Sequence, residues 1–267
     1  MLDERVDLSS RAQTNLQLYA ELTAGSYSDR ALDLVGVAYD AAMELFSGQF
    51  RGDGRPFLAH LVGTAAILGR LRAPIDVVLA GLLHSAYEFG DFGDGTSGMD
   101  AAKCGRLEAI VGLEAERLIA AYTAFPWNEK TIVQLAERAD KLSEREKQLV
   151  LIRLANIVDD TTDHGVLYCD KAVYLTVLLD RTEPHLKRLA IAIGQPAFAA
   201  AVEHLHAELK SAKIASALRR ARPGSFVLAP ASYTPRGGVK LRKLLQRLHG
   251  KVTRIHRRSG KRNKPMP

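Results

Sequence analysis

The sequence has little of what secreted and membrane-spanning proteins depend on. Its two cysteines, Cys104 and Cys169, fit neither a metal-binding spacing nor a disulfide framework, which favours a reducing compartment. The longest apolar stretch, residues 189–202, is interrupted by Gly-Gln-Pro and is shorter than the ~20 residues of a membrane span. Residues 1–10 are acidic and lack the apolar core of a secretory signal. We therefore expect a cytoplasmic protein, and peripheral contact with a membrane stays open.

Alternating patterns typical of β-strands are absent from the first 220 residues. Apolar residues recur there at spacings of three and four, and the 47% hydrophobic content is enough for a large core. The sequence therefore predicts an all-α helical bundle. We expect helices over residues 31–46, 57–71, 76–87, 100–121, 131–141, 148–158, 174–179, 186–193 and 198–218. Three helix starts are marked by capping residues: residues 26–28 before Asp29, Asp100, and Ser143 with Glu146 in a capping-box pattern.

Acidic residues are missing from the last part of the chain. Residues 210–267 contain 17 lysines and arginines and no aspartate or glutamate, so the net charge of +7 hides a region of −10 before them. We predict a helical domain at 1–209, a linker rich in glycine and proline at 210–238, and a basic amphipathic tail at 239–267. The tail carries leucines along one side.

Three partners suit such a tail. An anionic membrane surface would attract its cations and accept its leucines. A nucleic acid would bind through phosphates, although the tail lacks interleaved aromatic residues after Tyr233. A partner protein, a second copy of the chain or the acidic helical domain itself would also complement its charge. The sequence does not separate these alternatives, and a homo-oligomer is among them.

Two histidines lie in consecutive apolar helix patterns. His60 belongs to the pattern over residues 57–71 and His84 to that over 76–87, with Pro74 preventing the first helix from continuing into the second. Such a pair of helices folds back on itself and brings its side chains together. A histidine among small apolar residues is often only a hydrogen-bonded core residue. Taken alone, the two histidines therefore leave a structural role open.

The stretch that holds these histidines resembles the hydrolase domain of the RelA/SpoT-type (p)ppGpp enzymes, which belong to the HD superfamily of metal-dependent phosphohydrolases. Its pattern A-H-x-G-Q-x-R-x-x-G-x-P-Y-x-x-H-P is followed by L-L-H-D-x-x-E-D. The residues that match are Gly48, Gln49, Arg51, Gly54, Pro56, Phe57 in place of tyrosine, His60, Leu82, Leu83, His84 and Glu88. Residues 110–119 and 149–156 are similar to two later segments of the family, so the resemblance spans roughly residues 31 to 160.

The resemblance also shows where this chain departs from the family. The family's metal is held by the two histidines, the aspartate of the H-D pair and the aspartate of an L-A-D segment. Here Ser85 and Asn156 occupy the aspartate positions. Hard divalent cations prefer carboxylate oxygens, which a hydroxyl and an amide do not supply. We therefore predict a degenerate metal site and expect no cofactor in it.

A rebuilt metal site is the alternative. Asp159 and Asp160 follow Asn156 by three and four residues, so on a helix they project from one face. Together with His60 and His84 they could hold Mn, Fe or Zn, with Glu88 as the catalytic proton carrier. The opposing interpretation places Asp159, Asp160 and Asp163 in a solvated acidic turn.

The resemblance implies that Arg51 contacts a ligand, because the family uses the matching loop arginine near the nucleotide base. A glycine-rich loop at residues 89–98 follows Glu88 and is a candidate lid. We expect a phosphorylated or nucleotide ligand to meet Arg51, His60, His84, Ser85 and Asn156 without being hydrolysed. The alternative is an active metal-dependent phosphohydrolase with a rebuilt site, so whether the protein is an enzyme stays open.

Overall fold

Several helices begin at the residues that the sequence marks as caps. The Ser28 side chain accepts the amide of Ala31, and Asp100 accepts the amide of Lys103. Ser143 and Glu146 form a reciprocal capping box. Each cap satisfies backbone donors that the first turn of a helix leaves without a partner. The predicted starts at these positions are confirmed.

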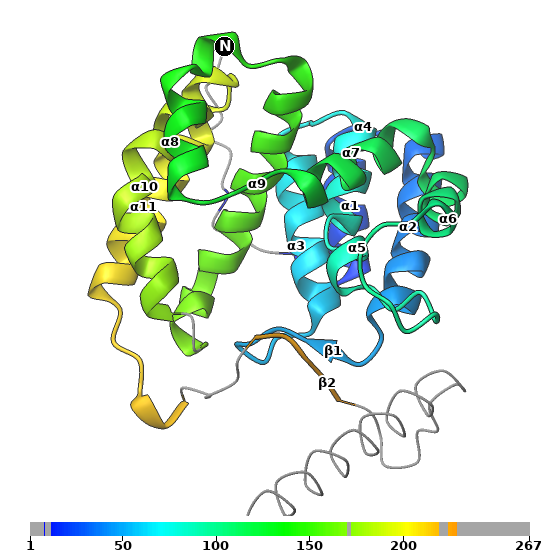
Figure 1. Cartoon of the computed structure of the whole chain (residues 1–267), viewed down its shortest axis with the longest axis horizontal. Helices are drawn as coiled ribbons and strands as arrows, with labels where there is room; N and C mark the ends of the chain where they lie inside the picture. The colour runs from blue at the N-terminus through cyan, green and yellow to red at the C-terminus, as the bar shows by residue number, and fades with distance from the viewer. Residues whose placement is uncertain (1–7, 9–11, 170–171, 219–223, 229–267) are drawn as a thin grey trace, which may run out of the picture.

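The computed structural model describes residue 8 and residues 12–169, 172–218 and 224–228, and it confirms the all-α bundle (Figure 1). The α-helices are α1 (Asn15–Ala24), α2 (Asp29–Phe46), α3 (Phe57–Arg70), α4 (Ile75–Leu83), α5 (Ala86–Phe89), α6 (Ala101–Val111), α7 (Leu113–Ala124), α8 (Glu129–Glu137), α9 (Glu144–Thr161), α10 (Ala172–Ala192) and α11 (Pro196–Ser211). Helix α9 lies between α8, α10 and α11 on one side and the group that contains α3, α4 and α7 on the other. Within the described residues, no helix has both the length and the apolar character needed to cross a membrane.

Several predicted helices have different bounds in the structure. The helix expected over 198–218 ends at Ser211. The helix expected over 76–87 ends at Leu83, and α5 begins at Ala86, so His84 and Ser85 lie at a break. The helix expected over 100–121 is divided at Gly112, whose φ of +84° lies outside the helical region. Conversely, the stretches expected at 174–179 and 186–193 form one helix, α10, which continues through Pro184.

Helix α10 tolerates Pro184 because α11 contacts it on both sides of the proline, after it through an ion pair of 2.8 Å between Lys187 and Glu203. His206 of α11 contacts the carboxylates of Asp180 and Glu183, which precede the proline. Leu179 and Leu186 are buried on the same helix. These contacts offset the backbone hydrogen bond that a proline removes.

Helix α3 forms the centre of the core. All its residues except Leu58 and Arg70 are buried, and it packs against α1, α4 and α9. Gly63 allows the close approach of α9, because a Cβ atom there would lie 1.9 Å from Oδ1 of Asp159. Gly81 of α4 likewise allows close packing against α3, because a Cβ atom there would lie 2.3 Å from Cδ1 of Leu68. The sequence thus places small residues where helices meet, and one of these places admits a buried carboxylate.

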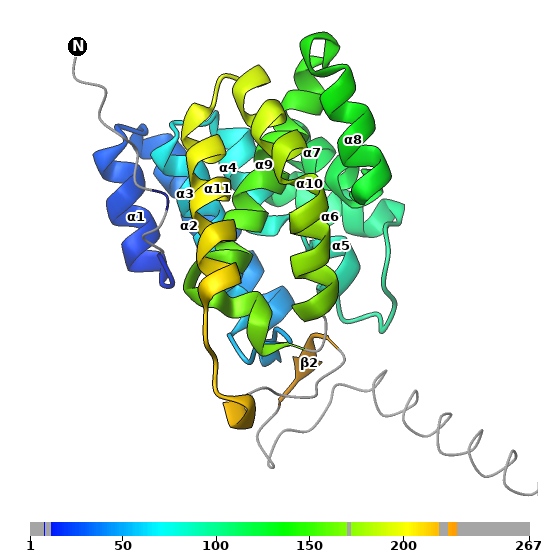
Figure 2. The same ribbon diagram turned by 90° about the vertical axis from the view of Figure 1, so that its left-hand side faces the viewer.

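A short β-ribbon closes one end of the bundle (Figures 1 and 2). Strand β1 (Gln49–Phe50) pairs antiparallel with β2 (Phe226–Val227). Strand β2 belongs to the segment predicted as a linker, so part of that segment docks on the helical domain. The basic tail predicted at 239–267 lies outside the described residues.

The glycine-rich loop that follows α5 is fastened to α6. The buried ammonium group of Lys103 donates to the carbonyl oxygens of Thr96 and Gly98 and to Oγ1 of Thr96. Carboxylates of Asp94 and Asp100 lie 3.2 and 3.4 Å from the same Nζ. The lid hypothesis for this loop stays untested. Lys103 is one of its anchors, and the amides of Asp91 and Gly98 donate to the carbonyl oxygens of Leu45 and Tyr87.

Candidate functional site

The two histidines of the sequence pattern meet in the interior. His60 comes from the first turn of α3 and His84 from the end of α4, and the loop at Ala73 and Pro74 folds these helices together. Nε2 of His60 lies 3.2 Å from Nε2 of His84, and the rings are nearly perpendicular. Both side chains are almost fully buried. The helical hairpin therefore converts a spacing of 24 residues into direct contact.

The other ring nitrogen of each histidine fixes where its proton lies. Nδ1 of His60 donates to Oδ2 of Asp159 at 2.6 Å, and Nδ1 of His84 donates to the carbonyl oxygen of Gly81 at 2.8 Å. Burial lowers the pKa of His60 well below its usual value, and burial lowers the pKa of His84 to about 4. Both rings are thus neutral at pH 7, and both Nε2 atoms present lone pairs to each other.

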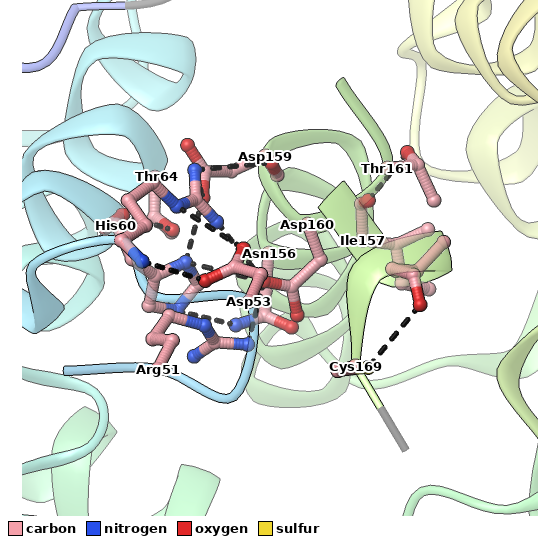
Figure 3. Close-up of polar contacts among 12 residues, drawn as sticks. Arg51, Asp53, His60, Thr64, Asn156, Ile157, Asp159, Asp160, Thr161 and Cys169 are labelled. Atoms are coloured by element: carbon pink, nitrogen blue, oxygen red, sulfur yellow. Dashed lines mark hydrogen bonds and ion pairs between the residues drawn. The ribbon is translucent and has the colours of Figure 1, made fainter. Parts of the chain in front are cut away.

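Asn156 of α9 places a hydrogen-bond donor between the two Nε2 atoms, whose lone pairs would otherwise face each other. Its Nδ2 lies 3.2 Å from Nε2 of His60 and 3.1 Å from Nε2 of His84. An amide NH₂ group carries two hydrogens, so it can donate one to each histidine. Figure 3 shows His60, Asn156 and the two aspartates converging between α3 and α9. The amide supplies the donors that two facing acceptors need in a buried place.

Asp159 and Asp160 bind arginines of the loop at residues 48–56. Oδ2 of Asp159, which is fully buried, lies 2.9 Å from Nη1 of Arg55. Oδ1 of Asp160 lies 2.6 Å from Nη2 of Arg51. Of the acidic turn considered from the sequence, only Asp163 is exposed. The two ion pairs compensate the charge of the inward carboxylates and hold the loop against α9.

The carboxylates and His84 lie on opposite edges of the His60 ring. Asp159 and Asp160 face Nδ1, at 2.6 and 3.4 Å, whereas His84 and Asn156 face Nε2. Across the described residues, the group of side chains close enough to share a metal ion is His60, Asp159 and Asp160. The donors gathered around the two Nε2 atoms are therefore neutral. Such a set does not fit a hard divalent cation, which prefers carboxylate oxygens.

A cavity of about 500 Å³ opens beside the histidines. Six of the residues singled out in the sequence line it: Arg51, His84, Ser85, Glu88, Asn156 and Asp160. His60 and Asp159 lie behind this wall. His60 contacts His84 and Asn156, which line the cavity, and Asp159 contacts His60. The structure thus brings most of the predicted residues to one cavity, and it places Glu88 at an exposed position of the rim.

Sequence reasoning missed part of the lining. Arg153 and Tyr122 face the cavity, and so do Val166, Gly224 and Ser225. Arg153 precedes Asn156 by three residues, so helical periodicity could have identified it. No sequence pattern could have identified Gly224 and Ser225 as lining residues, because their position depends on pairing between strands far apart in the sequence.

Arg153 is held in place by aromatic and backbone groups. Its guanidinium carbon lies 3.8 Å from the centre of the Tyr122 ring, and Nη2 donates to the carbonyl oxygens of Tyr122 and Phe125 at 3.0 and 2.9 Å. Burial raises the pKa of Tyr122 to about 12, so its hydroxyl stays neutral. Arg153 therefore presents a fixed positive charge to the cavity.

Comparisons with known proteins give distant matches. Residues 43–126 match a family model described as a domain of unknown function, DUF6817. A probable GTP diphosphokinase, RSH2, chloroplastic, from Oryza sativa subsp. japonica is 28% identical over 185 residues, which cover 61% of this chain and 25% of that protein. A GTP pyrophosphokinase from Myxococcus xanthus is 36% identical over 62 residues, which cover 23% of this chain and 8% of that protein.

A putative GTP diphosphokinase, RSH1, chloroplastic, from Arabidopsis thaliana is 38% identical over 63 residues, which cover 24% of this chain and 7% of that protein. The matched part of this chain thus spans a quarter or less of the length of these relatives. The chain is distantly similar to RelA/SpoT-type GTP diphosphokinases.

Proposed function

We propose that this protein has an HD-type helical domain and binds a phosphorylated ligand of the nucleotide class in the cavity beside His84, without hydrolysing it. The observation that carries this proposal is the position of Asn156. Its amide donates to both Nε2 atoms, where a metal-dependent hydrolase would need charged oxygen ligands. The pair of histidines is then satisfied by hydrogen bonds within the protein.

The cavity offers groups that suit a phosphorylated ligand. Arg51 and Arg153 bring two guanidinium groups to its lining, and guanidinium forks match phosphate oxygens. Ser85 and Asn156 add neutral groups capable of hydrogen bonding. Similarity to proteins named GTP diphosphokinase supports guanosine phosphates as the first ligands to test.

Calorimetric titration with guanosine tetraphosphate, GTP, GDP and inorganic pyrophosphate tests the proposal. We expect binding in the presence of EDTA, and no released phosphate or pyrophosphate by anion-exchange chromatography with or without Mn²⁺. Arg51→Ala should weaken binding at least tenfold. Arg106→Ala is the matched control, because Arg106 also pairs with a carboxylate, Glu44, but does not line the cavity. Failure of all four ligands to bind would refute the proposal.

A metal-dependent phosphohydrolase is the second candidate, and one observation favours it. Metal-bound histidines usually donate their other N–H to a carboxylate or a carbonyl, as His60 and His84 do to Asp159 and Gly81. The rebuilt site would draw on His60, His84, Asp159 and Asp160, with Glu88 as proton carrier. Elemental analysis of the wild type and of His60→Ala/His84→Ala decides this: one equivalent of Mn, Fe or Zn, lost in the variant, would support the second candidate over the first.

A further inference from the structure

The segment at residues 224–228, called the strap below, crosses the loop that carries Arg51 (Figures 1 and 2). Val227 pairs with Gln49, and Phe226 pairs with Phe50. The amide of Leu228 donates to the carbonyl oxygen of Gly48 at 2.8 Å. The rings of Phe50 and Phe226 stack with their centres 5.5 Å apart. Among the described residues, a short ladder and an aromatic contact join the strap to the loop.

Two glycines let the strap approach the loop. Gly48 has a φ of +72°, and a Cβ atom there would lie 2.6 Å from the carbonyl oxygen of Leu228. A Cβ atom on Gly52 would lie 3.5 Å from the carbonyl oxygen of Gly224 and 3.3 Å from Cβ of Cys169. Gly224, Ser225, Gly52 and Cys169 all line the cavity. The strap thus forms one wall of the cavity, beside Cys169.

The attachment of the strap is weak compared with the rest of the cavity. Val227 and Leu228 are 68% and 55% exposed, and only Phe226 packs its ring against the domain. A two-stranded ribbon of this length is marginal by itself. The opposite walls come from α7 and α9, whose side chains reach the core. Local opening at the strap should therefore cost less than opening at α7 or α9.

We propose that the strap is a movable wall of the cavity, and that ligands enter and leave when β2 separates from β1. Opening removes Gly224 and Ser225 from the lining and increases the exposure of Cys169, which is half-buried when β2 is paired. Closure completes the cavity around a bound molecule. The nature of that molecule rests on the function proposed above, whereas the movement of the strap does not.

Reactivity of Cys169 measures this opening without any ligand. In a Cys104→Ser background, Cys169 is the one cysteine of the chain, and its rate of reaction with a maleimide follows its exposure. Phe226→Ala removes the stacked ring, and we expect it to increase the rate several-fold. Val227→Ala changes an exposed residue of the same strand and is the matched control. Equal rates in these two variants, with unchanged melting temperatures, would overturn the proposal.

A reversible lock gives the opposite test. Gln49 and Val227 face each other across the ribbon, next to the hydrogen bond from Leu228 to Gly48, so cysteines at both positions can form a disulfide. Oxidised Gln49→Cys/Val227→Cys should label at Cys169 more slowly than Gln49→Cys alone, as read by peptide mass spectrometry. Reduction should restore the rate. An oxidised lock that leaves the rate unchanged would also overturn the proposal.

Adding guanosine tetraphosphate separates this inference from the proposed function. If the nucleotide slows labelling of Cys169 in the wild type, and if it dissociates faster from Phe226→Ala, both the strap inference and the proposed function stand. If Phe226→Ala labels faster but no phosphorylated ligand binds, the strap stands and the proposed function fails. If the ligand binds and both strand variants label like the wild type, the strap inference fails alone.

Discussion

Three buried histidines among the described residues, His60, His84 and His206, have both ring nitrogens engaged, and the partners of His60 and His206 differ in one respect. His60 faces a carboxylate at Nδ1 and an amide donor at Nε2. His206, between α10 and α11, faces the carboxylates of Glu183 and Asp180 at its two nitrogens. Ionised carboxylates only accept hydrogen bonds, so His206 has acceptors on both sides, whereas His60 has an acceptor on one side and an amide donor on the other. The two buried clusters therefore differ in the kind of hydrogen-bond partner that completes the ring.

The comparison also separates a structural cluster from a functional candidate. The cluster around His206 joins two helices and neutralises itself with Lys210 and Lys187 near the surface. The cluster around His60 leaves a neutral ring pair beside a cavity, with charges arranged in a loop and a helix around it. The second cluster borders a cavity with room for a ligand.

The largest effect is expected from removing the carboxylate that orients His60. Gly63→Ala places a Cβ atom 1.9 Å from Oδ1 of Asp159, so the carboxylate must leave His60 and Arg55. Breaking a buried ion pair typically costs ~3–5 kcal/mol. Urea unfolding should show a loss of this order. Gly105→Ala, in helix α6 with no atom within 4 Å of the new Cβ, should be neutral or stabilising by ~0.5–1 kcal/mol. Similar stability of the two variants would contradict this role of Gly63.

The next effect reverses the role of Asn156. Asn156→Asp replaces the donor between the two Nε2 atoms with a carboxylate, so three acceptors face one another. We expect the variant to bind Zn²⁺ or Mn²⁺ at least tenfold more tightly than the wild type, measured by calorimetry. Asn128→Asp, at the exposed cap of α8, adds the same charge elsewhere and should leave metal affinity unchanged. Equal affinities in both variants would contradict the assignment.

A smaller effect concerns pH. The pKa values of His60 and His84 are lowered in the folded protein, so the unfolded chain binds more protons below pH 6.5. Their contribution to stability is present above about pH 6.5 and is lost as the pH falls toward 4, with a slope of up to ~1.4 kcal/mol per pH unit for each histidine. The slope of the unfolding free energy against pH, measured by urea unfolding between pH 4 and 6.5, should be lower in His84→Gln than in the wild type by up to ~1.4 kcal/mol per pH unit. Identical slopes would show that His84 is not the neutral group described.

The smallest effect tests charge within the cavity. Asp160 neutralises Arg51 through a contact of 2.6 Å, so an anionic ligand must compete with it. Asp160→Asn keeps the shape and removes the charge, and we expect inorganic pyrophosphate to bind about threefold to tenfold more tightly, which is at most ~1.4 kcal/mol. Asp53→Asn, also on the lining, is a control for general charge. Weaker binding by Asp160→Asn would mean that Asp160 orients Arg51 instead.

The sequence predicted the helices best where caps and apolar spacing agreed, as at Ser28, Asp100 and Ser143. It predicted which residues gather, because a helical hairpin necessarily joins His60 to His84. It did not predict on which edge of His60 each partner would lie, since ring orientation depends on packing such as that of Gly63 against Asp159. Pro184 and the strap were missed for the same kind of reason: contacts from distant segments overrode or supplied the local structure.

The ammonium group of Lys103 supplies the positive charge around which the loop after α5 is arranged. Five oxygen-bearing contacts surround Nζ, from Asp94, Thr96, Gly98 and Asp100, in the manner in which protein oxygens enclose a dissolved cation. Unlike a free metal ion, this positive charge is covalently part of the chain, so its occupancy of the site does not depend on an ion concentration in solution. Chelators and changes in calcium or magnesium concentration should therefore leave the conformation of the loop unchanged, and these ions should not regulate it.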